Sequence, residues 1–154
     1  EMPIVAAARE VNFRQRLRAV EKLQEALKGV RGRIIGILGL AFKPGTDDVR
    51  ESPALDVIRI LCQRGAHVRA HDPMALDKAR RALNGLEVEF FSDLYALADG
   101  AEALLLVTDW PEYRRLDLTR LAKLMRTPVF LDGRNVFDPN EARKAGFIYL
   151  GVGR

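Results

Sequence analysis

The chain has 154 residues, of which 48% are apolar and 30% are charged, with a net charge of +4. This length suits a single domain with a substantial core, and no apolar run approaches the roughly 20 residues of a membrane-spanning helix. The start lacks the basic segment and apolar core of a secretory signal. The single cysteine, Cys62, excludes an internal disulfide and fits a reducing compartment. We therefore expect a soluble, cytoplasmic protein with no membrane partner.

The first expected element is one long helix. Residues 4–28 contain neither proline nor glycine, and five apolar residues form one helical stripe: Phe13, Leu17, Val20, Leu23 and Leu27. Residues 1–33 also hold eight bases and four acids, whereas the rest of the chain has 17 of each. A nucleic-acid binder would carry basic surface and stacking aromatics on its main domain. The charge instead indicates the solvated face of this helix, and we expect no nucleic-acid partner.

Short apolar runs alternate with helical stretches after residue 33. The expected strands are 33–40, 67–71, 87–91, 103–107, 128–132 and 147–150. Ser52 and Asp138 each stand before a proline and are expected to cap helices, as is Asp117, while Ser92 and Gly100 bracket another helix. Alternation of this kind implies right-handed crossovers and a parallel sheet covered on both faces. The sequence therefore predicts a doubly wound, Rossmann-like α/β fold of about six strands.

The loop after the first strand does not fit the dinucleotide fingerprint. Gly36 and Gly39 are three residues apart, and no helix begins before Ser52, whereas the fingerprint runs from its glycines directly into a helix. The loop instead offers the ammonium group of Lys43. If the strand order is 3-2-1-4-5-6, Lys43, residues 108–110 and Arg134 converge at the carboxyl edge of the sheet.

Lys43 as a point charge and Arg134 as a planar fork suit a diphosphate or sugar hydroxyls. The alternative is that both side chains pair with Asp47, Asp48 or Asp132, and the spacing alone leaves the two readings open.

Other polar residues favour structural roles. Asp47 and Asp48 are adjacent and suit a turn or a cap. Asp72 ends the second strand, where a dinucleotide fold has its ribose-binding acid, and its role stays open. The two histidines, at 67 and 71, have no further ligands with metal-site spacing, so no metal site is expected. Cys62 shares a helical stripe with Leu55, Ile58 and Leu61, which predicts a core position and no nucleophilic role.

Four motifs in register resemble the nucleotide-sugar dehydrogenases. They are GLAFKPGTDDVRESPALDVI, HDP, VTDWPEY and DGRNVFDP, in that order. Together they resemble the C-terminal, UDP-binding domain of the UDP-glucose 6-dehydrogenases, and residues 1–30 resemble the end of the helix that joins the two domains of those enzymes. Residues 31–154 would then form the nucleotide-sugar-binding domain. The long helix implies a homodimer, because it forms much of the dimer interface in the family.

The resemblance also implies roles for individual residues. Phe42, Lys43 and Arg134 would contact the nucleotide sugar, and Arg50 would reach the NAD held by the other domain. Family enzymes oxidise UDP-glucose to UDP-glucuronate with NAD and a catalytic cysteine that lies upstream of the matched residues, so Cys62 does not inherit that role. We expect this chain alone to be inactive and to contain no catalytic residue. The alternatives are a UDP-N-acetylmannosamine or GDP-mannose dehydrogenase, or a stand-alone nucleotide-binding or dimerisation module.

Overall fold

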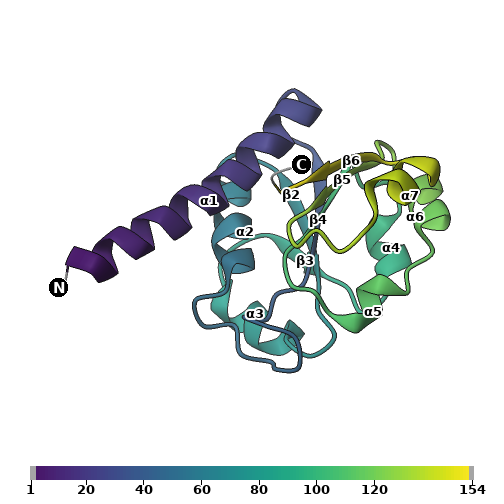
Figure 1. The fold of residues 1–154 in the computed structure, drawn as a ribbon. Helices are drawn as coiled ribbons and strands as arrows, with labels where there is room; N and C mark the ends of the chain where they lie inside the picture. Colours follow the sequence, from purple (N-terminus) through teal and green to yellow (C-terminus); the bar gives the residue numbers. More distant parts are fainter. Residues whose placement is uncertain (1–2, 153–154) are drawn as a thin grey trace.

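The computed structural model describes the backbone of residues 3–152 and the side chains of residues 13–152. Its centre is one sheet of six parallel strands in the order β3-β2-β1-β4-β5-β6 (Figure 1). The strands are β1 (Ile34–Leu38), β2 (His67–His71), β3 (Val88–Phe90), β4 (Ala103–Leu106), β5 (Val129–Asp132) and β6 (Ile148–Gly151). The predicted doubly wound fold and strand order are confirmed, and the ends of every strand lie within two residues of its expected run.

The helices also follow the sequence signals. They are α1 (Pro3–Leu27), α2 (Pro53–Gln63), α3 (Leu76–Ala82), α4 (Leu94–Ala98), α5 (Pro111–Arg114), α6 (Leu118–Leu124) and α7 (Pro139–Lys144). The side chains of Ser52, Asp117 and Asp138 cap α2, α6 and α7 as predicted. At α4 the cap is Asp93, one residue after Ser92, because its carboxylate accepts a hydrogen bond from the Tyr95 N–H at 3.0 Å.

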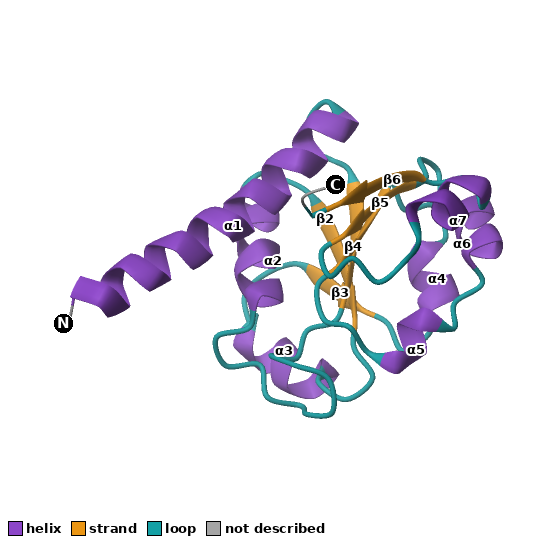
Figure 2. Ribbon diagram, in the orientation of Figure 1, coloured by secondary structure: helices purple, strands orange, loops and turns teal. Residues whose placement is uncertain are grey.

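The helices cover the sheet on both sides, with α1 and α2 on one side and α4 to α7 on the other (Figures 1 and 2). Right-handed crossovers to β4, β5 and β6 run on the second side, so they leave the first face of that half of the sheet uncovered. Helix α1 fills this place, since it contacts both α2 and β5. The Lys22 ammonium also donates to the Gly151 carbonyl at the end of β6, at 3.1 Å.

The apolar stripe of α1 packs only along its second half. Val20, Leu23 and Leu27 are buried and Leu17 is half-buried, whereas Phe13 is 50% exposed. The N-terminal half of the helix projects beyond the body of the domain (Figure 1), so the domain offers nothing there for Phe13 to pack against. The predicted long helix is confirmed, and three of the five residues of its apolar stripe are buried.

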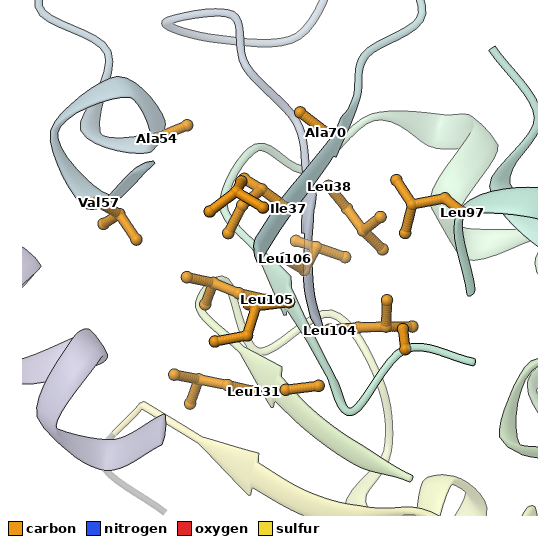
Figure 3. Close-up of a cluster of buried hydrophobic side chains, with 14 of the residues drawn as sticks. Ile37, Leu38, Ala54, Val57, Ala70, Leu97, Leu104, Leu105, Leu106 and Leu131 are labelled. Carbon is orange, nitrogen blue, oxygen red and sulfur yellow. The ribbon is translucent and has the colours of Figure 1, made fainter. Parts of the chain in front are cut away.

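The core lies between β1, β4 and β5 and the helices on either side. Leucines of β4 and β5 meet Ala54 and Val57 of α2 on one side and Leu97 of α4 on the other (Figure 3). A Cβ at Gly36 would lie 2.4 Å from Leu97 Cδ2, so this glycine permits close helix–sheet packing. The predicted core position of Cys62 is partly confirmed: its side chain is half-buried and packs against the core from the last turn of α2, and burial raises the pKa of its thiol.

Gly39 marks the close approach of the loops that follow β1 and β4. Its φ of +96° lies in the left-handed region, and a Cβ there would lie 2.6 Å from Thr108 Cβ. Any side chain would separate these two loops. Gly36 in β1 and Gly39 directly after it thus permit close packing. This role explains why their spacing differs from that of the phosphate-binding fingerprint.

Asp72 joins three loops at the carboxyl edge of the sheet. This buried carboxylate accepts hydrogen bonds from the N–H groups of Leu40 and Ala41 after β1, at 2.8 and 2.9 Å. It also accepts from the N–H groups of residues 74 and 75 after β2, each at 2.8 Å, and from the Trp110 indole after β4, at 3.2 Å. Since both oxygens are engaged in this way, Asp72 has a structural role, and the open reading as a ribose-binding acid is not supported.

His71, the residue before Asp72, is buried against Tyr113 of α5. The imidazole Nδ1 lies 2.9 Å from the Tyr113 hydroxyl, which also donates to the His71 carbonyl at 3.2 Å. Burial lowers the pKa of His71, although Asp72, Glu112 and Asp93 and a hydrogen bond to the Ser92 backbone oppose this shift. The neutral imidazole is therefore the form that the folded chain favours.

We predict that Asp72→Asn lowers the free energy of unfolding by about 2–4 kcal/mol, because an amide nitrogen would face buried N–H donors that need an acceptor. Urea denaturation measures the loss. The matched control is Asp77→Asn, an exposed carboxylate of α3, which should change stability by about 0.5 kcal/mol or less. Equal effects of the two substitutions would contradict the structural role of Asp72.

We also predict that stability falls as the pH drops below about 6.5, the ordinary pKa of histidine. The unfolded chain protonates His71 first, since the folded chain has the lower pKa, so this contribution is present above that pH and is lost on acidification. His71→Gln should reduce the loss measured by urea denaturation between pH 7.5 and 5.5. His67→Gln, at the exposed histidine, should not. An unchanged loss in His71→Gln would refute the prediction.

Candidate functional site

A cleft of about 460 Å³ opens at the carboxyl ends of β4 and β5. Its walls come from α1, the start of α2, the loop after β1, the loop after β5 and the end of the chain after β6. The lining includes Phe42, Pro53, residues 105–107, Gly133, Arg134 and Val152. Ligands of open α/β sheets bind at this edge, so the cleft is the candidate binding site.

Phe42 lies on one wall of the cleft, and its backbone is held while its side chain stays 52% exposed. The Phe42 N–H donates to the Asp48 carbonyl at 2.7 Å. The preceding carbonyl, of Ala41, accepts from the Thr108 hydroxyl at 2.7 Å. An aromatic face on a fixed backbone can contact a flat or apolar part of a ligand without a further loss of loop freedom.

Arg134 lies on the opposite wall, in a loop fixed by Asp132. The fully buried Asp132 carboxylate accepts from the N–H groups of Arg134 and Phe137, at 3.1 and 2.9 Å, and from the Tyr149 hydroxyl, at 2.7 Å. The Gly133 N–H donates to the Leu106 carbonyl at 2.9 Å, and a Cβ at Gly133 would lie 2.5 Å from that oxygen. Because of this close contact with β4, only glycine fits at position 133, directly before Arg134.

The Arg134 guanidinium and the Lys43 ammonium have no ion pair or hydrogen bond within residues 13–152, and both are exposed. Their predicted alternative partners are engaged elsewhere. Asp47 pairs with Lys78 at 3.0 Å, and the Asp132 carboxylate accepts from a backbone and a hydroxyl. The third alternative, Asp48, pairs with an arginine of its own loop. Both cations are therefore available to an anion.

The predicted convergence is only partly realised. Phe42 and Arg134 line the same cleft, whereas Lys43, the next residue after Phe42, is not part of the lining. Thr108 and Trp110 do lie at this edge, but both are buried and their polar atoms bind Ala41 and Asp72. They support the loops and do not face a ligand.

Arg50 also lies outside the cleft lining. Its side chain is 87% exposed and forms a two-bond contact with Asp48, with Nε to Oδ1 at 3.1 Å and Nη2 to Oδ2 at 3.0 Å. This hydrogen-bonded pair lowers the pKa of Asp48 to about 2. The structure thus leaves Arg50 at the surface, paired with Asp48.

Helix α1 contributes cations that the sequence reading assigned to a solvated face. Arg16, Arg18 and Lys22 line the cleft. Arg16 bonds to the Asp56 carboxylate and the Glu51 carbonyl, while Arg18 has no ion pair or hydrogen bond within the described side chains. The excess of bases in residues 1–33 was the available signal. Only the packing of α1 against the sheet shows which of these bases face the cleft.

The described residues contain no cluster of three or more His, Cys, Asp or Glu side chains that could hold a metal ion. None of the described helices is long and apolar enough to cross a membrane.

Comparison with known proteins identifies the family. The model described as "UDP-glucose/GDP-mannose dehydrogenase family, UDP binding domain" matches residues 36–139. The UDP-glucose 6-dehydrogenase TuaD of Bacillus subtilis is 46% identical over 98% of this chain, and the UDP-glucose 6-dehydrogenase of Pseudomonas aeruginosa is 40% identical over 98%. The chain spans about a third of each of these relatives, 32% and 34%.

Solved structures agree. A UDP-glucose dehydrogenase from Pyrobaculum islandicum matches 96% of this chain with a TM-score of 0.76 and 45% identity, and the match covers 31% of that protein. A UDP-D-ManNAc dehydrogenase from Pyrococcus horikoshii matches the whole chain with a TM-score of 0.80 and 33% identity, over 34% of its length. The chain therefore belongs to the UDP-glucose/GDP-mannose dehydrogenase family and forms its C-terminal, UDP-binding domain.

Proposed function

We propose that the cleft between α1 and the carboxyl ends of β4 and β5 binds the UDP part of a nucleotide sugar. The observation that carries this proposal is the Arg134 guanidinium, which has no partner within the described side chains although its backbone is fixed on both sides. A planar cation held in this way suits bidentate contact with phosphate or ribose oxygens. The family assignment supports the same ligand.

Phe42 and Lys43 complete the proposed substrate contacts from the opposite wall. Phe42 offers an exposed aromatic face to the cleft, and the adjacent ammonium of Lys43 reaches a ligand that extends out of it. We assign no proton transfer to Phe42, Lys43 or Arg134. They bind and orient the nucleotide sugar, which fixes its reacting carbon relative to groups on another domain.

We further propose that the complete protein is an NAD-dependent UDP-glucose 6-dehydrogenase that converts UDP-glucose to UDP-glucuronate in the cytoplasm. The relatives in which this chain spans about a third carry that enzyme name. NAD and the catalytic cysteine would be supplied by the remaining part, toward which the exposed Arg50 would reach. UDP-N-acetylmannosamine is the alternative substrate, because a UDP-D-ManNAc dehydrogenase matches the whole chain.

We predict that Arg134→Ala weakens UDP binding by this chain by about 10- to 100-fold, because charged hydrogen bonds contribute about 1.5–3 kcal/mol each. Lys43→Ala should weaken it less, since a mobile ammonium makes single contacts. Calorimetric titration with UDP measures both effects. Arg115→Ala is the control, because it removes an exposed charge that lies outside the cleft.

The same calorimetric titrations, repeated with GDP, test which nucleotide the cleft prefers. UDP should bind more tightly than GDP if the cleft recognises uridine. Wild-type affinity in Arg134→Ala, or the same loss in Arg115→Ala, would contradict the proposed site.

The homodimer is also a proposal, and it rests on α1. This helix projects beyond the body of the domain and carries Phe13, 50% exposed, on its apolar stripe (Figure 1). A second copy of the helix could cover that side chain. We predict that Phe13→Asp shifts the chain from dimer to monomer in sedimentation velocity, because a buried unpaired carboxylate opposes association. A wild-type chain that sediments as a monomer at high concentration would refute the dimer.

A further inference from the structure

Asn135, the residue after Arg134, joins the cleft loop to the chain that follows β6. Its Nδ2 donates to the Val152 carbonyl at 2.9 Å, and its Oδ1 accepts from the Val152 N–H at 3.0 Å. The side-chain amide thus makes the two hydrogen bonds that a neighbouring strand would make. Both Arg134 and Val152 line the cleft, so this reciprocal contact links two of its walls.

The backbone of Asn135 favours this residue type. Its φ is +52°, in the left-handed region that side chains other than glycine rarely adopt and that asparagine tolerates best. An asparagine side chain also carries a donor and an acceptor side by side, which the contact with Val152 requires. Alanine lacks both properties, and glycine has only the first. Aspartate tolerates the backbone but has only the acceptor.

The loop after β5 is also held by contacts that do not involve the Asn135 side chain. Asp132 already holds the N–H groups of Arg134 and Phe137, and Gly133 is bonded to β4. Asn135 lies between these fixed points, and its side chain makes two hydrogen bonds that link this loop to Val152. Its contribution is therefore to the position of Arg134 relative to the opposite wall.

We propose that Asn135 is a positioning residue for nucleotide binding, which acts by holding Arg134 and Val152 together at the mouth of the cleft. The inference rests on the proposed function, since it requires that Arg134 contacts UDP. Without the amide contact, the segment next to Arg134 loses these direct hydrogen bonds to Val152, and a ligand must order both when it binds.

The test is calorimetric titration of the chain with UDP. We expect Asn135→Ala and Asn135→Gly each to weaken binding on the order of tenfold, the loss that about two exposed hydrogen bonds explain. Asn135→Gly keeps the left-handed backbone, so it isolates the amide contact. Asn140→Ala, an exposed asparagine of α7 outside the cleft lining, should bind UDP as the wild type does. Thermal unfolding of each variant shows that the domain stays folded.

A double-mutant cycle separates positioning from general stability. If Asn135 acts through Arg134, the double variant Arg134→Ala/Asn135→Ala should bind no more weakly than Arg134→Ala alone. Additive losses would overturn the inference, as would wild-type affinity in Asn135→Gly. If the Arg134→Ala variant loses affinity while both Asn135 variants do not, only the positioning role fails. If the wild-type chain does not bind UDP, the proposed function fails, and the inference fails with it.

Discussion

The buried carboxylate of Asp72 accepts hydrogen bonds from three loops at the point where the strand order reverses, between β1 and β4. A buried carboxylate is stable only when its oxygens are fully hydrogen-bonded, so the loops after β1, β2 and β4 must keep their relative positions. These contacts also position one wall of the cleft, because Phe42 follows directly from the residues that Asp72 holds.

Asp132 has the same structural role at the end of β5, where it accepts hydrogen bonds from loop N–H groups. One carboxylate fixes a loop through its N–H groups, and the basic side chain of Arg134 is left without a partner among the described residues. At this edge Asp72 and Asp132 organise backbone, while Arg134 lines the cleft. This division of roles supports the proposed anion site, although acids and bases are equally frequent in residues 34–154.

Helix α1 has two roles in this arrangement. Its apolar stripe covers the half of the sheet that the crossovers leave open, and its polar flank brings Arg16, Arg18 and Lys22 to the cleft. Removal of this helix would expose core residues and one wall of the site together. The proposed boundary near residue 30 therefore divides the chain by resemblance to longer enzymes, whereas the packing of Val20, Leu23 and Leu27 makes the end of α1 part of the domain core.

The alternating elements, most of the helix caps and the parallel sheet could be predicted from the sequence, because these depend on local periodicity and on capping side chains such as Ser52 and Asp138. Its motifs also indicated the family. Tertiary structure decided which polar groups are engaged: Asp72 proved structural, Arg134 stayed available, and Asn135 reached Val152. Asp72 lies 31 or more residues from its partners after β1 and β4, and Asn135 lies 17 residues from Val152. Only the folded sheet brings such partners within hydrogen-bonding distance.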